Sequence, residues 1–400
     1  MRQDALAPLA IPANDLSPVL APLPVAVSRL MLTDFRGYAR ARLAVDAMPV
    51  VLYGANGAGK TNLLEALSFL APGRGLRRAK LSEIDCHNQP GPWALAAVVA
   101  LPSGEIEIGT GRDDTSDSGE RRSLRIDGTP AKSQQELAEH FGMAWLTPQM
   151  DRIFIDGASS RRRFLDRLVT GFDPGHWARL NAYEKALRER ARLLRDGSRP
   201  GNGADGTWLA ALEEIMAENG VALAAARIEA VSRLDAACRS AQGPFPRAGL
   251  EISGAVETWI QSMPALSAEE AFRGALCSGR RLDAESGVTQ CGPHRSDLLV
   301  RHLETGVEAG SCSTGEQKAL LIAITLAYAR LAAARRGQAP LLLLDEITAH
   351  LDAERRSALF AALLDLKAQA WLAGTDASLF EELRGNAQFF AISHAAIAPG

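Results

Sequence analysis

The sequence lacks the markers of a secreted, membrane-bound or zinc-binding protein. Its five cysteines are odd in number, widely spaced and without a Cys-x-x-Cys pair, which argues against a disulfide framework or a zinc site. No apolar run reaches the length of a membrane span, and the N-terminus lacks the basic start and unbroken apolar core of a signal peptide. We therefore expect a cytoplasmic protein with reduced thiols and no membrane partner.

An excess of charge is also missing, and aromatic residues are few. The 400 residues carry a formal net charge of −3, and 6% of them are aromatic. A chain this close to neutral is not a uniformly basic coat for nucleic acid, although it can carry local basic patches. Its length exceeds one ordinary hydrophobic core, so we expect two lobes, one of them inserted into the other.

The clearest motif that is present is a glycine-rich loop at residues 53–62, YGANGAGKTN. It matches G-x-x-x-x-G-K-[ST] and lies between an apolar, strand-like run and a helical pattern, which is the context of a phosphate-binding loop. Backbone amides of such a loop surround a polyphosphate, a lysine adds positive charge, and a threonine hydroxyl ligates Mg²⁺. The predicted binding residues are Gly54, Ala55, Asn56, Gly57, Ala58, Gly59, Lys60, Thr61 and Asn62, and Lys60 is also a predicted catalytic residue.

A pair of acidic residues follows four leucines at 341–344. Such a run is typical of a buried parallel strand whose carboxylates emerge at the edge where α/β sheets bind ligands. We expect Asp345 to hold Mg²⁺ together with Thr61, and we expect Glu346 to polarise the attacking water. A simple strand end that leads into a solvent loop is the alternative for this pair.

A helix start at residues 313–317 supports two compatible interpretations. Ser313 and Glu316 have the spacing of a capping box, and the same helix start is a site for an anion. We favour phosphate binding, because Gly315 would otherwise weaken the first turn of the helix without any return. In a sheet built this way, this segment and the glycine-rich loop cannot easily reach the same nucleotide within one chain.

The remaining pattern predicts the architecture. Strand-like segments at 28–33 and 39–45 are expected beside the strand of the glycine-rich loop. A helical pattern runs to about residue 241 from a helix capped by Ser159 or Ser160, and two long helices in it are separated by a Gly-rich turn at 196–206. Further strands are expected at 250–252, at 287–290, at 297–301 and, as the last of the chain, in a stretch that ends at Thr375.

The expected fold class is α/β, with an ABC-type P-loop ATPase lobe of mixed sheets and flanking helices and an inserted, mainly helical second lobe. The expected divisions are a disordered extension at 1–26, the first part of the ATPase lobe at 27–160, the helical lobe at 161–286, and the second part of the ATPase lobe, with the signature and acidic motifs, at 287–400.

The three motifs, in this order and with a helical insert between them, resemble an ABC-type ATPase head of the kind found in chromosome-maintenance (SMC) proteins. Within that group the chain is similar to the RecF family. The stretches that carry the resemblance are 32–38, 59–66, 161–166, 292–298 and 374–376.

The resemblance implies ATP and Mg²⁺ as cofactors and a homodimer that forms on ATP. Each nucleotide would lie between the glycine-rich loop of one subunit and the signature segment Ser313, Thr314, Gly315, Glu316 and Gln317 of the other. It further implies that Gln149 lies near Mg²⁺ and the attacking water, that Asp352 lies in the loop that crosses the dimer, and that Thr375 occupies the switch position.

Three further residues lie near these motifs. For Arg36, a contact with a phosphate and a solvated turn residue are open alternatives. His394 lies far beyond the acidic pair and is expected to be an ordinary histidine, and His294 lies in a family-typical stretch without a chemical role that the sequence defines.

Members of the RecF family are expected to bind double-stranded and gapped DNA, to hydrolyse ATP slowly with stimulation by DNA, and to help load RecA with RecO and RecR. The resemblance therefore implies roles in DNA repair, replication restart and the SOS response. A clamp that binds ATP without hydrolysis, and a related SMC-like head of another DNA pathway, are the alternatives. A transporter subunit is disfavoured, because no histidine stands near position 375 and the signature segment is not of the transporter type.

Basic clusters are the candidate contacts with DNA, since they neutralise phosphates without reading sequence. The alternative for each cluster is a solvated helix face, which is favoured for any single arginine. The candidates are Arg74, Arg77, Arg78, Lys80, Arg121 and Arg122, with Arg179, Lys185, Arg188, Arg192 and Arg195 on the helical lobe.

Overall fold

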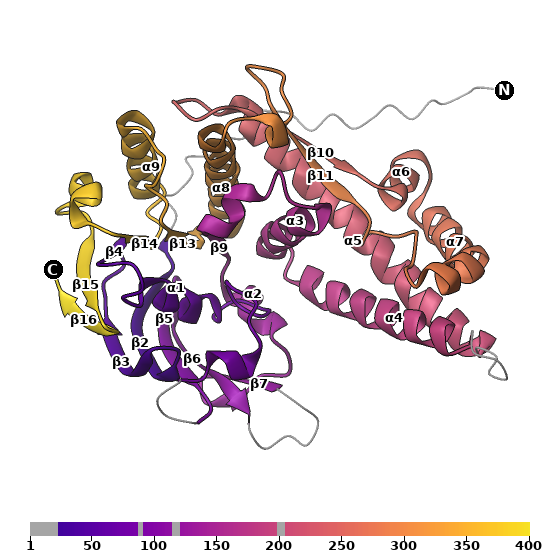
Figure 1. Cartoon of the computed structure of the whole chain (residues 1–400), viewed down its shortest axis with the longest axis horizontal. Coiled ribbons are helices and arrows are strands. Elements are labelled where there is room, and N and C mark those ends of the chain that lie inside the picture. The colour runs from indigo at the N-terminus through magenta and orange to yellow at the C-terminus, as the bar shows by residue number, and fades with distance from the viewer. Residues whose placement is uncertain (1–22, 87–90, 114–120, 198–204) are drawn as a thin grey trace, which may run out of the picture.

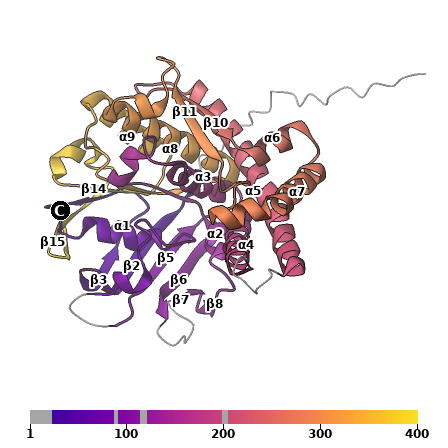
Figure 2. The same cartoon turned by 45° about the vertical axis from the view of Figure 1, so that its right-hand side comes forward.

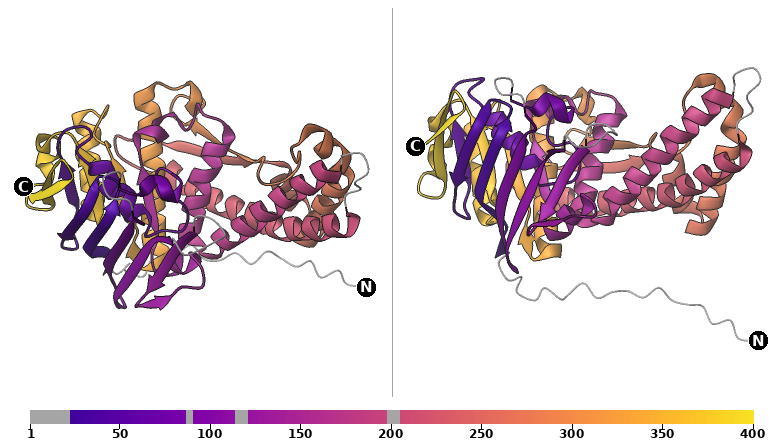
Figure 3. Two further views of the ribbon diagram at one scale, coloured as in Figure 1. Left: turned by 60° about the horizontal axis from the view of Figure 1, so that its bottom comes forward. Right: turned by 90° about the horizontal axis from the view of Figure 1, so that it is seen from below.

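The computed structural model describes residues 23–86, 91–113, 121–197 and 205–400. One lobe contains two six-stranded sheets with the helices that pack on them, and a helical arm extends from it (Figure 1). Figure 3 shows the arm as an elongated projection away from the two sheets. The mixed α/β class expected from the sequence is confirmed.

The first sheet is almost entirely parallel and has the strand order β16-β15-β4-β14-β13-β9. Every residue of β13 and β14 is buried, as in strands covered on both faces. The carboxyl ends of β4 and β13 therefore meet at one edge of the sheet with only β14 between them. The strands are β4 (Val50–Tyr53), β9 (Met143–Leu146), β13 (Leu341–Asp345), β14 (Ala370–Gly374), β15 (Gln388–Ser393) and the antiparallel β16 (Ala396–Pro399).

The second sheet is antiparallel and has the order β3-β2-β5-β6-β7-β8. The expectation that the strands at 28–33 and 39–45 lie beside the strand of the glycine-rich loop is wrong. They form a hairpin that pairs with β5, whereas β4 pairs with β14 and β15. The strands are β2 (Ala26–Phe35), β3 (Tyr38–Ala44), β5 (Ala94–Leu101), β6 (Gly104–Asp113), β7 (Arg121–Ile126) and β8 (Thr129–Pro130).

Helix α1 (Lys60–Ser68) lies between the two sheets (Figure 2). One hydrophobic cluster contains the inward side chains of both sheets and the buried face of α1, for example Leu32, Leu52, Leu63 and Leu343. Burying α1 on both sides fixes where the helix begins relative to β4. The core of the lobe thus sets the geometry of the turn that joins them.

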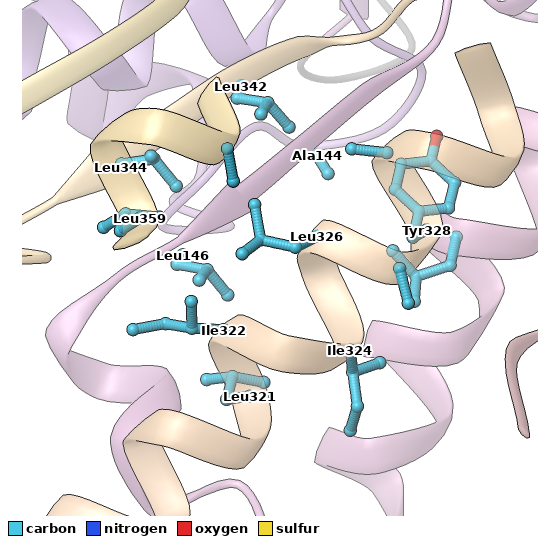
Figure 4. Packing of buried hydrophobic residues seen from close by; sticks show 14 of the residues in the cluster. Ala144, Leu146, Leu321, Ile322, Ile324, Leu326, Tyr328, Leu342, Leu344 and Leu359 are labelled. Carbon is cyan, nitrogen blue, oxygen red and sulfur yellow. The ribbon is translucent and has the colours of Figure 1, made fainter. Parts of the chain in front are cut away.

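The other face of the parallel sheet is covered by α3 (Ala158–Phe172), α8 (Thr314–Arg336) and α9 (Ala353–Asp365). Figure 4 shows Leu326 of α8 packed close to Leu146, with Leu342 and Leu344 nearby. In the part of the chain that the structure describes, α8 is the one helix long and apolar enough to cross a membrane. Its apolar window is 83% buried inside the lobe, so the apolar composition is that of a core helix.

The helical arm consists of two long helices with two further helices packed on them. Its described elements are α4 (Gly175–Gly197), α5 (Gly206–Ser240), α6 (Ala255–Ser262) and α7 (Ala265–Ser286), with the antiparallel pair β10 (Ala248–Ser253) and β11 (Asp297–His302) at its base. Helices α6 and α7 fall within the helical lobe expected at 161–286, although the sequence analysis did not place them individually. The strand expected at 287–290 is wrong, because Gly287 at a φ of 70° ends α7 and no strand follows it directly.

Several other boundaries differ from the expectations. Helix α3 begins at Ala158 after Gly157 without a side-chain cap, so Ser159 and Ser160 lie inside the helix. The strand that ends near Thr375 is not the last strand of the chain, because β15 and β16 follow it. Most of the expected turn at 196–206 lies outside the described residues.

The extension expected at 1–26 also lies largely outside the described residues. Its last residues form strands, because β1 (Leu23–Pro24) pairs in parallel with β12 (Gln338–Ala339) and β2 begins at Ala26. Short helices complete the described chain: α2 (Gln135–His140), η1 (Leu81–Ile84), η2 (Pro148–Arg152), η3 (Ala309–Ser311) and η4 (Ala377–Leu383).

Buried polar contacts fix the arm to its base. The Arg227 guanidinium on α5 donates to both carboxylate oxygens of Asp166 on α3, at 2.8 and 2.9 Å, and His176 contacts the same carboxylate at 2.9 Å. His294 lies 2.6 Å from the Tyr183 hydroxyl through Nδ1 and 2.9 Å from the Thr289 carbonyl through Nε2. Since a carbonyl only accepts, Nε2 donates to it and Nδ1 accepts from the tyrosine, which gives His294 a structural role.

Candidate nucleotide-binding site

The glycine-rich loop joins β4 to α1 in a conformation that its glycines permit. Gly54 has a φ of 149°, and a Cβ there would collide with the backbone carbonyl of Ile392 on β15. Gly59 has a φ of 117°, and a Cβ there would lie 2.8 Å from the Tyr38 hydroxyl. Helix α1 begins directly after Gly59 without a side-chain cap, so its first amides are available to an anion.

The ammonium group of Lys60 lies inside this loop. Its Nζ donates to the carbonyls of Gly54 and Ala55 at 2.7 and 2.9 Å, and the residue is 5% exposed. Burial lowers the pKa of Lys60, while the charges of Glu346 and Asp345 raise it. The positive charge is thus held between the loop and the acidic pair, where a terminal phosphate would displace the two carbonyls.

Thr61 and Asp345 bring two hard oxygen ligands together across the sheet edge. The Thr61 hydroxyl donates to Asp345 Oδ1 at 3.3 Å. Burial raises the pKa of Asp345, and the hydrogen bond from Thr61 lowers it. A hydroxyl and one carboxylate fit Mg²⁺, which is usually held by few protein ligands together with phosphates and water. No group of three or more His, Cys, Asp or Glu that could hold a metal occurs within the described ranges.

Glu346, which follows Asp345 directly, is held in an unusual backbone conformation. Its φ is 49°, and its amide donates to Ala373 O of β14 at 3.0 Å. The Glu346 carbonyl accepts from Lys318 Nζ at 3.0 Å. A strained backbone at this point is sustained by the contacts around it, which include this lysine.

Lys318 is a functional candidate that the sequence analysis missed. It is 3% exposed on the second turn of α8, and its Nζ lies 3.6 Å from Asp151 of η2. Burial lowers the pKa of Lys318, and the nearby acids raise it. The signal in the sequence was its position directly after the 313–317 segment, where it precedes the long, mainly apolar part of the helix. The lysine ties α8, η2 and the loop of Glu346 together.

Gln149 and Thr375 lie at the same edge of the sheet. Gln149 is exposed on η2, which follows β9, and Thr375 is exposed directly after β14. Both strands are parallel neighbours of β13. The sheet therefore places both residues at the edge that carries the acidic pair, although no hydrogen bond joins either side chain to it in the described chain.

The 313–317 segment forms the expected capping box at the start of α8. Ser313 Oγ accepts from the Glu316 amide, and Glu316 Oε2 accepts from the Ser313 amide at 2.8 Å. Ser313 and Thr314 are exposed. No hydrogen bond or ion pair in the described chain joins this segment to the glycine-rich loop. The cap is confirmed, and binding of a phosphate stays a prediction.

Asp352 and Arg36 have structural partners within the chain. Asp352 is the N-cap of α9, where its carboxylate accepts from the Arg355 amide at 2.7 Å. Arg36 donates to both oxygens of the buried Glu65 at 3.0 and 2.8 Å and to the Glu83 carbonyl. The alternative of a solvated turn residue is wrong for Arg36, because its guanidinium is engaged. A contact with phosphate would require it to exchange these partners.

One of the residues predicted to contact DNA, Arg122, is buried, so this prediction is wrong. Arg122 is 8% exposed, lies over the Phe69 ring, and donates to Thr110 Oγ1 at 2.8 Å and to the carbonyls of Phe69 and Gly73. Burial lowers the pKa of Arg122 to about 9. The alternation of β7 points Arg122 inward and its neighbour Arg121 outward.

Other basic candidates gather at one hollow beside the antiparallel sheet. Its volume is about 880 Å³, and its lining includes Arg74, Lys80 and Arg121 together with Arg125 and Lys132, which the sequence analysis did not select. The partners of Arg77 are Asn62 and Glu65. On the arm, Arg179 and Arg188 pair with acidic neighbours, whereas Lys185, Arg192 and Arg195 are exposed. Arg78 is exposed as well.

The site combines a glycine-rich loop at a helix start, an acidic pair two strands away, and a separate signature segment at the exposed start of a core helix, all within a mixed-sheet lobe. This combination defines an ATPase head of the ABC type.

Comparison with known proteins identifies the family within that class. The family described as "RecF/RecN/SMC N terminal domain" matches residues 26–397. The "DNA replication and repair protein RecF" of Mesorhizobium japonicum is 50% identical over 382 residues, which cover 94% of this chain and 99% of that protein. The RecF of Rhizobium rhizogenes is also 50% identical, over 379 residues, with 94% of this chain and 99% of that protein covered. The chain belongs to the RecF family and is an ABC-type ATPase.

A solved structure supports the fold. A structure described as the recombination mediator protein RecF-ATPrS in the RecFOR pathway superposes with a TM-score of 0.80 at 23% identity, and the match covers 95% of this chain and 99% of that one. At this identity the likeness concerns the fold alone, and the residue roles rest on the geometry given above.

Proposed function

We propose that the chain is an ATP-dependent DNA-binding recombination mediator that dimerises when it binds ATP. The observation that carries the proposal is the separation of the site into two parts. Lys60, Thr61, Asp345 and Glu346 converge at one sheet edge, while the capped, exposed start of α8 forms no hydrogen bond or ion pair with the loop in the described chain. A second copy of the chain would bring its Ser313 segment to the open side of the nucleotide.

Each part has a distinct task in this proposal. The loop amides and Lys60 bind the terminal phosphates, and Glu346 orients the attacking water. Thr61 and Asp345 would hold Mg²⁺, which neutralises phosphate charge when bound, and Gln149 would help to position it. Asp352 would communicate between the subunits, and Thr375 would contact the γ-phosphate.

DNA binding is assigned to the basic hollow beside the antiparallel sheet. Arg74, Lys80, Arg121, Arg125 and Lys132 line it, and their charges would neutralise phosphates of double-stranded or gapped DNA. Such binding depends steeply on salt and little on sequence. Arg77, Arg78 and the exposed arm residues could extend this contact.

The cellular role follows from the relatives. They are named for DNA replication and repair, and the similar solved structure is described as part of the RecFOR pathway. We accordingly assign the chain to the cytoplasm, with RecO-like and RecR-like partners that help to load RecA during repair, replication restart and the SOS response. Hydrolysis is expected to be slow and stimulated by DNA.

The test is light scattering of purified protein with and without saturating ATP and Mg²⁺. Glu346→Gln, which keeps the nucleotide site but loses the carboxylate, is expected to accumulate as a dimer with ATP. Ser313→Arg is expected to bind ATP and stay monomeric.

A monomeric Glu346→Gln protein in saturating ATP would contradict the proposal. If the wild-type protein dimerises but releases no phosphate with ATP and DNA, the alternative of a clamp without hydrolysis replaces it.

A further inference from the structure

A cavity of about 400 Å³ lies between the two lobes, away from the acidic pair. The loop at 71–78, β9 and η2 form its wall on the side of the sheets, and α3 and α4 form its wall on the side of the arm. Aromatic and apolar side chains line much of it, among them Phe141, Trp145, Phe164, Trp177 and Leu180. A volume and lining of this kind suit a small organic ligand.

A positively charged side chain in this wall has no negative partner. The Arg167 guanidinium stacks on the Trp145 ring at 4.0 Å, and its Nε is enclosed without a hydrogen-bond acceptor. Its Nη2 reaches only Trp145 O at 3.5 Å and Met150 Sδ at 3.7 Å. No carboxylate of the described residues lies within ion-pair distance of it, and burial lowers the pKa of Arg167 to about 9.

The fully buried arginines of the described chain all have partners, whereas Arg167, which is partly exposed along the cavity, has no charged partner. Arg190 pairs with Glu213 and Asp283, and Arg227 pairs with Asp166. Arg122 donates to several carbonyls. The Trp145 and Phe164 rings lie against the Arg167 guanidinium, but no anion neutralises its charge, so the side chain is available to an anionic ligand in the cavity.

The charged groups around the cavity do not supply the missing anion. Arg74, Arg77, Arg78 and Arg163 add further positive charge to its lining. Of the acidic side chains, Asp166 is bound by Arg227 and His176, Glu184 pairs with Arg188, and Asp156 lies outside ion-pair distance of Arg167.

A second enclosed polar group lies next to the cavity. The Tyr328 hydroxyl is buried without a hydrogen-bond partner. It adjoins Gly142 and Gly171, two residues of the cavity wall. Figure 4 shows this hydroxyl at the end of the ring on α8.

We propose that this cavity binds a small organic anion, a flat apolar group that bears one phosphate or one carboxylate. The flat group would lie among Trp145, Phe164 and Trp177, and the anion would pair with the Arg167 guanidinium, whose planar fork suits either oxyanion. Neither the glycine-rich loop nor the acidic pair lines the cavity, and the inference does not depend on dimerisation or on DNA binding. Because Gln149 also lines the cavity, an occupant would lie against the η2 loop of the ATPase site.

Calorimetric titration of the full chain, without nucleotide, tests the proposal with two probes. 2-Naphthyl phosphate and 2-naphthoate share the flat group and differ in the anion, so they distinguish the two sources of charge. We expect at least one to bind with a stoichiometry of one. Inorganic phosphate and neutral 2-naphthol, which each lack one half of the ligand, should bind at least about tenfold more weakly.

Two variants and a control locate the binding. Arg167→Gln should lower the affinity for the bound probe by about 10- to 100-fold, the effect of losing a hydrogen-bonded charge. Arg167→Lys should restore part of that affinity. Arg233→Gln, in an exposed ion pair on α5, should leave binding unchanged.

The proposal is overturned if neither probe binds below about 1 mM, or if Arg167→Gln binds as tightly as the wild type while its melting temperature is normal. If Arg167→Gln does not fold, Trp177→Ala at the opposite wall replaces it, with the same loss expected and the same result decisive.

Discussion

Two adjacent arginines on β7 differ in what their loss should do. Arg122→Ala leaves buried carbonyls without a donor and is expected to lower the free energy of unfolding by roughly 3 kcal/mol. Arg121→Ala should leave stability unchanged and weaken binding to duplex DNA at all sequences, with a salt slope smaller by about 1. Urea unfolding and fluorescence anisotropy at several salt concentrations check the pair. Equal effects of both variants on DNA affinity, at equal stability, would contradict the assignment.

The carboxylate of Asp166 provides a second prediction, because it neutralises the buried Arg227. Burial raises the pKa of Asp166, but Arg227 and His176 lower it by more, and the net pKa lies below the usual range of aspartate. With a lower pKa in the folded than in the unfolded state, the stabilisation is complete above about pH 4 and is lost as the pH falls through the folded pKa.

Asp166→Asn should therefore lower the free energy of unfolding at pH 7 by about 3–5 kcal/mol, the effect of leaving a buried charge unpaired. The difference from the wild type should shrink only below about pH 4. Glu229→Gln, which breaks an exposed pair with Arg233, is the matched control and should cost less than about 1 kcal/mol. If Asp166→Asn lowers the free energy of unfolding by no more than the control does, the buried Asp166–Arg227 pair does not stabilise the fold as proposed.

The sequence predicted individual site residues where a motif with fixed short spacing defines their chemistry. The glycine-rich loop and the acidic pair follow from short spacings, and the structure brings Thr61 and Asp345 into contact. The partners of Arg36 and Arg122, by contrast, are carboxylates and carbonyls distant in the chain. Whether a basic side chain meets solvent or such a partner is decided by tertiary packing, which a single sequence does not display.

At the scale of elements, α8 is the connection between the signature segment and the acidic pair. Its Lys318 contacts the Glu346 carbonyl and Asp151 of η2. Lys318→Met should lower kcat for ATP hydrolysis by about tenfold or more and change KM by less than about twofold, since the nucleotide contacts stay intact.

Lys318→Arg keeps the charge and should restore part of the rate. Steady-state kinetics with ATP, together with a melting curve for each variant, checks the prediction. A variant that loses nucleotide affinity and stability in parallel with kcat would assign the lysine to folding rather than to positioning.

Elements were predicted well where one signal dominated. The four leucines before Asp345 form a fully buried strand, and the long helices of the arm follow their apolar spacing. The strand of the 28–33 segment was placed in the wrong sheet, because an apolar alternation identifies a strand and not its neighbours. Helices α6 and α7 lie within the helical lobe expected at 161–286, but their individual bounds were not predicted.

At the scale of the whole molecule, the two-part site predicts complementation between different inactive chains. Lys60→Ala should abolish ATPase activity in its own site, and Ser313→Ala, which adds no bulk at the subunit contact, should disable the partner site that it would complete. A mixture of the two proteins forms pairs that contain one site with an intact lysine and an intact serine. We expect the mixture to regain part of the wild-type ATPase rate.

The control is a chain with both substitutions, which should restore nothing when mixed with either single variant. Colorimetric phosphate release at constant total protein measures the outcome. If the mixture of the single variants stays as inactive as its components, each nucleotide is processed within one subunit and the dimer proposal fails.

The strand order of the parallel sheet has a consequence for synthesis on the ribosome. The strand that ends in the glycine-rich loop, β4, is made early, yet its neighbours β14 and β15 come from the last part of the chain. At ordinary translation rates the nascent β4 waits on the order of tens of seconds for them. The antiparallel sheet and the arm can form on the emerging chain, whereas the ATP site can assemble only when translation is nearly complete.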